Sequence, residues 1–428
     1  MAARPRSGPI TRRTALAGLV GTICCPLIGG ARAIAADAGP VFSKAGPNAE
    51  LYGAADNYPL PSWLGRREGN PFSPKYRVGA FSHIDEIYPT RRLARSDAPW
   101  SFGRAGAEIR YKFRGNASSI DDYLARNPVT GLLIAKDDQI LCEHYQYGRT
   151  DQDRLVSQSM VKSITGLLVG LAIADGAIKS VDDTPQMYVP GFAGSEYGKT
   201  PIRALLHMSS GVEFGEDEDH GRDLNRLWGS MVNRSWSHQM GTINAITQFN
   251  HRIAPPGTRF YYASIEPDVL GVVVHYATGK SLSDYLQQKV WQPIGTEADA
   301  SWVLDAEDFE LAHFGFNAVL RDYARLARLL AHDGAWNGKQ IVPAQWMLEA
   351  TTLRPADAYL ALGKATPDFG YGYLFWLLPG DRRQFSLWGA YGQRIIIDPA
   401  SKLILVQTGL DNISEVWSLW RAVVAQLG

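Results

Sequence analysis

The chain has 428 residues, of which 45% are hydrophobic and 20% charged, and its 43 basic residues balance its 43 acidic ones. This composition is typical of a globular protein with a sizeable core, and it argues against wholesale disorder. Because the chain carries no excess of positive charge, its composition does not favour a nucleic-acid-binding protein.

The first 35 residues contain five arginines and no acid. Arg12 and Arg13 form a twin-arginine pattern, followed by a weakly apolar stretch to about residue 28 and by small residues at 33–35. This order is typical of an export signal cleaved before Ala36. The alternative is a short membrane anchor, but the stretch is too short and glycine-rich to span a bilayer comfortably. We expect a periplasmic or secreted protein, exported by the twin-arginine route, with no stable membrane anchor after cleavage.

Cleavage of the signal would remove two of the three cysteines and leave Cys142, which alone cannot form an internal disulfide. The nine histidines are scattered, with no His-Glu-x-x-His run and no paired cysteines at metal-ligand spacing. We therefore expect no metal and no other cofactor.

The order of the remaining segments predicts one main body with an N-terminal addition. Residues 36–125 are rich in proline, glycine and aromatic residues, and we expect an irregular N-terminal arm packed on the body formed by residues 126–428. Apolar patterning predicts strands at 131–135 and 139–145, helices over about 176–345, strands at 371–378, 384–388, 393–397 and 403–408, and a closing helix at 414–426. This order predicts an α+β fold, an antiparallel sheet flanked by helices with an all-helical lobe.

The most informative stretch of the chain is the run Ser159-Met160-Val161-Lys162-Ser163, which precedes an apolar segment ending at Gly176. Residues three apart on a helix share a face, so the Ser159 hydroxyl would lie within reach of the Lys162 amine. An apolar setting favours the neutral form of an amine. This combination can activate a serine nucleophile without a histidine.

A second motif is a proline-glycine turn that leads to Tyr262 and Ser264 ahead of another apolar helix. A tyrosine close to a protonated lysine is more easily deprotonated, so Tyr262 could shuttle the proton of Ser159. Tyrosines before helices are mostly packing residues, so this motif carries little weight alone.

A third motif, Trp388-Gly389-Ala390-Tyr391-Gly392, leads into the predicted strand at 393–397. Its glycines would allow a strand edge to approach a substrate closely. A backbone N–H on that edge, together with the N–H of Ser159, could form an oxyanion hole. Taken alone, the motif is equally consistent with an ordinary turn between strands.

The order and spacing of the three motifs resemble the beta-lactamase-related serine hydrolases. This superfamily includes class C beta-lactamases, D-Ala-D-Ala carboxypeptidases, family VIII carboxylesterases and 6-aminohexanoate-dimer hydrolases. The resemblance covers about residues 75–425 and implies a beta-lactamase/transpeptidase-like fold.

The resemblance also implies a role for each residue of the motifs. Ser159 would be the nucleophile, Lys162 the amine that activates it, and Tyr262 the general base that later protonates the leaving group. Ser264 would orient the lysine. The backbone N–H groups of Ser159 and Ala390 would form the oxyanion hole, with Tyr391 as the alternative to Ala390.

The third motif departs from the carboxylate-binding branches of the superfamily. Beta-lactamases and carboxypeptidases carry Lys-Thr-Gly or His-x-Gly where this chain has Trp388-Gly389-Ala390. The bulky indole favours neutral or apolar substrates. Arg394 could still supply a positive charge, provided that its side chain faced the site.

Residues 391–393 and the acidic, aromatic segment 213–236 most resemble the 6-aminohexanoate-dimer hydrolase branch. The segment includes Trp228 and is interpreted either as a lid over the site or as a solvated loop with packing aromatics. We expect the substrate pocket to be lined by Ser264, Trp388, Gly389, Tyr391 and Trp228.

These observations predict a metal-free serine hydrolase that acts through an acyl-enzyme on short-chain carboxylic esters, and on linear amides such as 6-aminohexanoate oligomers as a further class. The alternative within the superfamily is a D-Ala-D-Ala carboxypeptidase or a class C-like beta-lactamase. The alternative of another class is a catalytically silent binding protein on the same fold. We expect a monomer or homodimer whose partner is a small ester or amide, not a nucleic acid.

Overall fold

A computed structural model describes residues 39–54, 59–65, 69–216, 221–232 and 240–428 of the chain. The predicted export signal at 1–35 lies outside the described residues, and so do residues 217–220 and 233–236 of the segment interpreted as a lid. Export therefore stays a prediction. None of the helices in the described part of the chain combines the length and apolar character needed to span a bilayer.

Two sheets organise the described residues, and the larger one has nine strands. Its centre is antiparallel, and there a strand from the N-terminal half of the chain pairs with a strand near the C-terminus. In spatial order the strands are β1 (Val41–Phe42), β7 (Gln139–Tyr145), β6 (Val129–Lys136), β17 (Leu403–Gly409), β16 (Gln393–Asp398), β15 (Phe385–Gly389), β14 (Trp376–Leu377) and β13 (Gly370–Tyr371), and β3 (Gly103–Arg104) also pairs with β7. Only the short β1 and β3 pair in parallel among these described strands.

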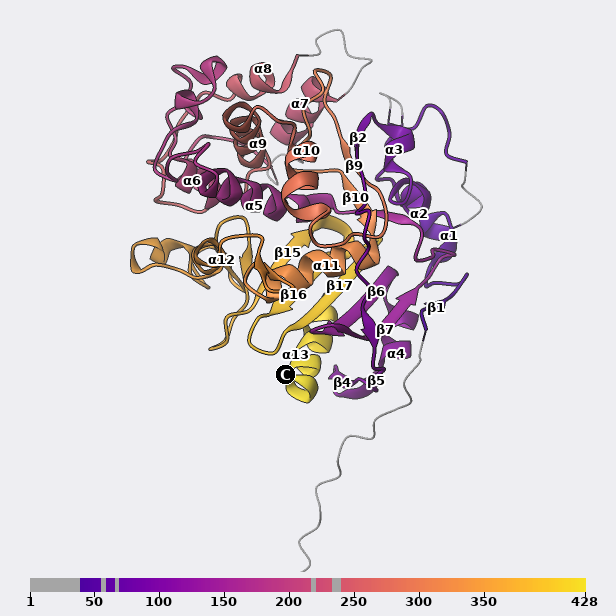
Figure 1. The fold of residues 1–428 in the computed structure, drawn as a ribbon. Coiled ribbons are helices and arrows are strands. Elements are labelled where there is room, and N and C mark those ends of the chain that lie inside the picture. Colours follow the sequence, from indigo (N-terminus) through magenta and orange to yellow (C-terminus); the bar gives the residue numbers. More distant parts are fainter. Residues whose placement is uncertain (1–38, 55–58, 66–68, 217–220, 233–239) are drawn as a thin grey trace, which may run out of the picture. The chain divides into compact units, whose positions relative to one another are not determined.

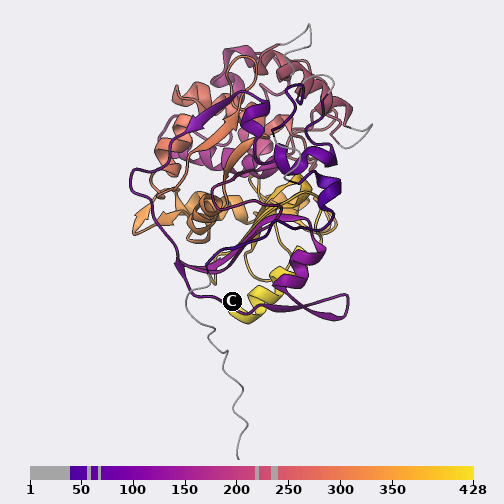
Figure 2. The same ribbon diagram turned by 90° about the vertical axis from the view of Figure 1, so that its right-hand side faces the viewer.

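The larger sheet buries both of its faces, and alternate residues of one strand enter different cores. Ile395 and Ile397 of β16 pack in the core shared with the helical region, whereas Ile396 packs against α13 (Val416–Leu427). This alternation follows from the two-residue period of a strand. As a result α11 (Leu320–Ala331) covers one face and α13 the other (Figures 1 and 2).

A second sheet of four antiparallel strands carries the segment that leads to Ser159. Its strands are, in spatial order, β2 (Thr90–Leu93), β9 (Ala300–Val303), β10 (Phe316–Val319) and β8 (Arg154–Val156). Two hairpins complete the strands, β4 (Arg110–Phe113) with β5 (Asn116–Ser119) and β11 (Ala335–Trp336) with β12 (Lys339–Gln340). The range 176–345, where helical periodicity dominates, thus also contains β9 and β10.

Most of the helices gather on the side of the larger sheet opposite α13 (Figure 1), but Ile120, Tyr123 and Leu124 of the helix that follows β5 pack in the same core as α13. In the helix that follows Ser159, each residue from Val161 to Ala172 is buried. The α-helices not yet given are α1 (Ala49–Tyr52), α2 (Arg77–Ala80), α3 (Ile84–Ile87), α4 (Ile120–Arg126), α5 (Val161–Ala174), α6 (Ile202–Leu206), α7 (Arg222–Met231), α8 (Thr242–Thr247), α9 (Ile265–Thr278), α10 (Leu282–Leu286) and α12 (Ala344–Thr351). Short helical turns are η2 (Pro74–Tyr76), η3 (Gln158–Met160), η4 (Pro185–Met187), η5 (Pro190–Phe192), η7 (Gln287–Trp291), η8 (Pro355–Leu360) and η9 (Ala390–Gly392).

Most elements that the sequence predicts on either side of the helical region are confirmed. The two strands around 136–138 correspond to β6 and β7, and those at 384–388, 393–397 and 403–408 to β15, β16 and β17. The continuous strand predicted at 371–378 is wrong. The chain turns back at Leu374, whose φ is 61°, and forms the hairpin of β13 and β14.

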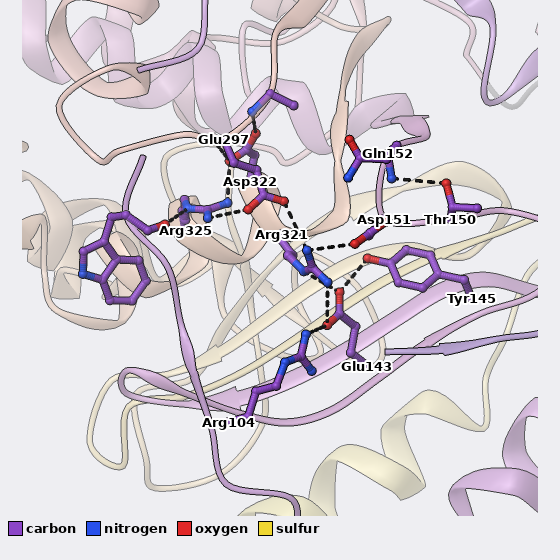
Figure 3. Close-up of polar contacts among 12 residues, drawn as sticks. Arg104, Glu143, Tyr145, Thr150, Asp151, Gln152, Glu297, Arg321, Asp322 and Arg325 are labelled. Atoms are coloured by element: carbon purple, nitrogen blue, oxygen red, sulfur yellow. Dashed lines mark hydrogen bonds and ion pairs between the residues drawn. The ribbon is translucent and has the colours of Figure 1, made fainter. Parts of the chain in front are cut away.

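A buried carboxylate, Glu143 on β7, connects β7 to β3 and to α11 (Figure 3). It accepts hydrogen bonds from Arg321 of α11 at 2.7 Å, from Arg104 of β3 at 2.5 Å and from the Tyr145 hydroxyl at 2.7 Å. Arg321 also forms an ion pair with Asp151 at 3.0 Å. A buried charge is tolerated only when it is paired and hydrogen-bonded, and Glu143 meets both conditions.

We predict that Arg321→Met lowers the free energy of unfolding by about 3 kcal/mol, because it leaves the Glu143 carboxylate buried with one arginine instead of two. Urea denaturation followed by circular dichroism measures the change. The matched control is Arg110→Met, whose partner Glu108 is exposed, and it should change stability by less than about 0.5 kcal/mol. Equal effects of the two substitutions would contradict this account of Glu143.

Candidate active site

Ser159 lies in a sharp turn between β8 and α5. The residue before it, Gln158, is buried and has a φ of 47°, in the left-handed region that long side chains rarely occupy. The Ser157 N–H donates to the Phe316 carbonyl of β10 at 2.7 Å and fixes the start of the turn. Strained backbone of this kind persists only where the surroundings enforce it, and such strain clusters at functional sites.

The structure brings Lys162 to Ser159, as the three-residue spacing predicts. The Lys162 Nζ lies 2.7 Å from the Ser159 Oγ and 3.3 Å from the carbonyl oxygen of His313. The lysine side chain is buried and Ser159 is half-buried. The amine is therefore held against the hydroxyl, with little room for another position.

His313 is itself fixed by a buried carboxylate. Its Nδ1 lies 2.7 Å from Asp268 Oδ2 on α9, and both side chains are almost fully buried. The His313 carbonyl accepts a hydrogen bond from the Lys162 amine, so the His313–Asp268 pair also helps to position the lysine. Sequence reasoning missed both residues, and neither belongs to a recognisable motif.

Tyr262 reaches the same place from the turn that precedes α9. Its ring centroid lies 4.9 Å from the Lys162 Nζ. The ring of Trp376 on β14 stacks on the ring of Tyr262, with 5.7 Å between their centroids. The three residues proposed to move the proton thus lie together, although Tyr262 is a hundred residues from the other two.

Ser264 is placed differently from what the resemblance implies. Its hydroxyl donates to Glu216 Oε1 at 2.6 Å, and its backbone N–H also donates to that carboxylate. The Ser264 hydroxyl is thus engaged by the acidic segment 213–236, and the Lys162 amine is held by Ser159 and His313 instead.

The third motif meets the turn of Ser159 through Gly389. A β-carbon at Gly389 would lie 2.4 Å from the Ser157 carbonyl oxygen and 3.0 Å from the β-carbon of Gln158, so only glycine permits this approach. Ala390, the first residue of η9, is exposed directly beyond it. The Gln393 side-chain amide donates to the Ala390 carbonyl at 3.1 Å and to the Tyr391 carbonyl at 3.0 Å. The Gln393 side chain therefore satisfies the carbonyls of this turn and fixes its conformation.

The three aromatic residues predicted to line the pocket belong to two groups of packed rings. Trp388 belongs to the first, with ring centroids 5.0 Å from Trp376 and 5.1 Å from Phe369. In the second, Tyr391 stacks on Phe72 of the N-terminal arm at 6.5 Å, and Trp228 of α7 contacts the same phenylalanine at 6.2 Å. Trp228 therefore packs on Phe72, the residue on which Tyr391 stacks.

Phe314 completes the second aromatic group. Its ring lies 5.0 Å from Trp228 and 5.6 Å from Phe72, and it adjoins His313, whose carbonyl receives the lysine. Sequence reasoning missed Phe72 and Phe314, because nothing in the sequence indicates that the arm folds back onto the third motif. Within the described ranges no group of three or more histidine, cysteine or acidic side chains could hold a metal ion.

Comparisons with known proteins agree on a family and a fold. The family model described as "Beta-lactamase" matches residues 117–408, more than half of the chain. A 6-aminohexanoate-dimer hydrolase of Paenarthrobacter ureafaciens is 26% identical over 340 residues, which cover 77% of this chain and 84% of that protein. An Escherichia coli K12 protein described as "Putative D-alanyl-D-alanine carboxypeptidase" is 25% identical over 218 residues, 46% of this chain and 45% of that protein.

A solved structure described as "Putative 6-aminohexanoate-dimer hydrolase from Bacillus anthracis" matches this fold with a TM-score of 0.75. It is 23% identical in sequence, and the match covers 85% of this chain and 95% of that one. This likeness shows that the two chains share the antiparallel sheet and its flanking helices.

A buried acid beside the second motif was also missed by sequence reasoning. Glu266, in the first turn of α9, accepts a hydrogen bond from the Ser210 N–H at 3.2 Å, while its Oε2 has no partner among the described residues. Burial raises the pKa of this carboxyl to about 8. Near neutral pH the side chain therefore carries its proton.

This buried acid predicts how stability depends on pH. Between about pH 4.5 and pH 8 the folded chain keeps a proton on Glu266 that the unfolded chain loses, so this group makes stability fall as the pH rises. We predict that Glu266→Gln, which keeps the acceptor and cannot titrate, loses less stability than the wild type between pH 5 and pH 8. Urea denaturation across that range measures both. Parallel losses in the two proteins would show that Glu266 does not hold the proton.

Proposed function

The chain belongs to the beta-lactamase family, and we propose that it is a serine hydrolase that works through an acyl-enzyme on short-chain carboxylic esters and linear amides. The observation that carries this proposal is the 2.7 Å contact between the Lys162 amine and the Ser159 hydroxyl inside a buried setting. Nucleophile and activating base within hydrogen-bond reach are the signature of covalent catalysis by serine.

The proposed reaction uses all three motifs, which meet at Ser159. The Ser159 oxygen attacks the carbonyl carbon of the substrate while its proton passes to the Lys162–Tyr262 pair. The negative charge that develops on the carbonyl oxygen is received by the N–H groups of Ser159 and Ala390. The tetrahedral intermediate collapses and expels an alcohol or amine, which takes its proton from Tyr262. Water then attacks the acyl-enzyme and releases the acid, leaving Ser159 protonated.

The substrate class is supported by the walls of the site. The rings of Trp388, Trp376 and Phe369 provide an apolar surface where the carboxylate-binding branches have a cation. The similarity to a 6-aminohexanoate-dimer hydrolase, at 26% identity, supports linear amides as a second class of substrate. An apolar pocket discriminates weakly between an ester and an amide of the same shape, so one site can take both.

We predict that a fluorophosphonate labels the wild type once and that Ser159→Ala abolishes the label, as read by intact mass. Ser163→Ala, which removes a hydroxyl of the same helix that donates to the Leu374 carbonyl, should keep it. Lys162→Met should slow labelling by about a hundred-fold or more, because the base that removes the serine proton is lost. Equal, near-zero hydrolysis of p-nitrophenyl esters and short amides by wild type and Ser159→Ala would favour a silent binding protein instead.

The main alternative is a carboxypeptidase or beta-lactamase, and it is supported by the 25% identity with the Escherichia coli protein over 46% of the chain. A fluorescent penicillin and nitrocefin distinguish the two functions. Rapid acylation by the penicillin, with turnover of nitrocefin exceeding that of p-nitrophenyl butyrate, would replace the esterase proposal.

We further predict that Gly389→Ala lowers the rate of acylation about ten-fold or more, because the new β-carbon would lie 2.4 Å from the Ser157 carbonyl oxygen and force the strand edge away from Ser159. Gly39→Ala is the control, since no atom lies within 4 Å of a β-carbon there. Acylation is followed by stopped-flow release of p-nitrophenol. Equal rates in the two variants would mean that the third motif does not contribute to the reaction.

A further inference from the structure

A cavity of about 630 Å³ lies between the β14–β15 edge of the larger sheet and α13, behind Trp388. Four aromatic side chains contribute to its walls, and its volume suits a small organic molecule. The lining residues that matter here are Phe369, Trp388, Arg394, Asn412, Trp417 and Trp420.

Arg394 is the buried charge of this cavity. Its side chain belongs to a residue only 3% exposed. Its Nη1 donates to the carbonyls of Gly389 at 2.6 Å and Gln393 at 2.7 Å, whereas its Nε has no partner among the described residues. The guanidinium carbon lies 4.1 Å from the centre of the Trp388 ring, within the range of a cation–π contact.

The environment of Arg394 is unusual for an arginine in a protein interior. In the described part of the chain its polar contacts are carbonyl oxygens, and the ionisable groups that act on it most are the phenols of Tyr123 and Tyr262. Burial lowers the pKa of the Arg394 guanidinium, yet arginine keeps its proton in proteins. A buried cation whose charge is not matched by a carboxylate is costly, and an anion that entered the cavity would offset that cost.

We propose that this cavity is a binding site for a small carboxylate with an apolar or aromatic body, anchored by Arg394. The planar guanidinium matches a carboxylate, the indole rings of Trp388 and Trp417 match an apolar body, and Asn412 supplies a neutral polar group. The exposed rim carries Arg421 and Asp368, whose opposite charges offset one another, so Arg394 determines the sign of the ligand.

Ser159 is not among the residues that line this cavity, but the cavity shares Trp388 and Phe369 with the apolar surface proposed for the substrate, and Arg394 also holds the Gly389 carbonyl of the third motif. Loss of activity in an Arg394 variant would therefore be ambiguous, because it would also follow from a displaced Gly389. Binding is the informative measurement, and Ser159→Ala is the suitable background because no turnover can occur in it.

The test compares benzoate with its neutral counterpart benzamide by isothermal titration calorimetry and by quenching of tryptophan fluorescence in the Ser159→Ala protein. We expect saturable benzoate binding, with a dissociation constant in the millimolar range or tighter, and at least ten-fold weaker binding of benzamide. Arg394→Met should weaken benzoate binding about ten-fold or more. Arg421→Met, at the rim, should change it less than about two-fold.

A second variant keeps the proposal testable if Arg394→Met fails to fold. Ser414→Trp adds an indole at the exposed mouth of the cavity and leaves Arg394 in place, and it should block benzoate binding while its circular dichroism spectrum matches that of the parent. Absence of saturable binding up to about 50 mM benzoate would overturn the proposal. Equal affinity for benzamide, or unchanged benzoate binding in Ser414→Trp, would overturn it as well.

Discussion

Gly389 at the end of β15 lies against the backbone of the turn that presents Ser159, and the two segments are more than 200 residues apart in sequence. A β-carbon at this position would lie 2.4 Å from the Ser157 carbonyl oxygen, so the contact is one of backbone with backbone. It fixes the distance between the sheet edge and the turn of Ser159 without any flexible side chain between them. The Gln393 amide and the left-handed Gln158 hold the two sides in this position.

On the helical side of the site, buried polar contacts fix the position of Lys162. The Lys162 amine is located by the His313 carbonyl, and His313 by the Asp268 carboxylate on α9. The same helix begins just after Tyr262, so one element positions both the lysine's support and the tyrosine. The groups proposed to react are thus held by buried neighbours, which is the arrangement that catalysis by positioning requires.

The parts of this site that depend on local spacing could be predicted from the sequence. Ser159 and Lys162 share a helical turn, so their contact follows from a three-residue offset. The strands β15 to β17 follow from short, largely apolar runs, which are typical of strands buried on both faces. Tyr262 could be placed only through the family resemblance, because no local rule connects it to a residue a hundred positions earlier.

Other features depend on tertiary packing, and the sequence contains no signal for them. The direction of the Arg394 side chain follows from the face that β16 presents to α13, and the capture of Ser264 by Glu216 follows from the path of a loop. The sequence predicts one strand where the structure has the hairpin of β13 and β14, because the left-handed residue at the turn is Leu374, and leucine does not signal such a turn as glycine or asparagine does. The contact of Phe72 with Tyr391 likewise requires knowing where the N-terminal arm returns.

The contribution of that arm has a practical consequence for engineering. The match to the family model begins at residue 117, whereas Phe72, Phe81 and Arg77 all lie before it and pack on Tyr391 of the third motif. A library that varies only residues 72–81 would therefore reshape one wall of the site while leaving every residue of the shared hydrolytic core untouched. One wall of the proposed site therefore lies outside the stretch matched by the family model, and a graft of the arm onto a relative would measure what that wall contributes.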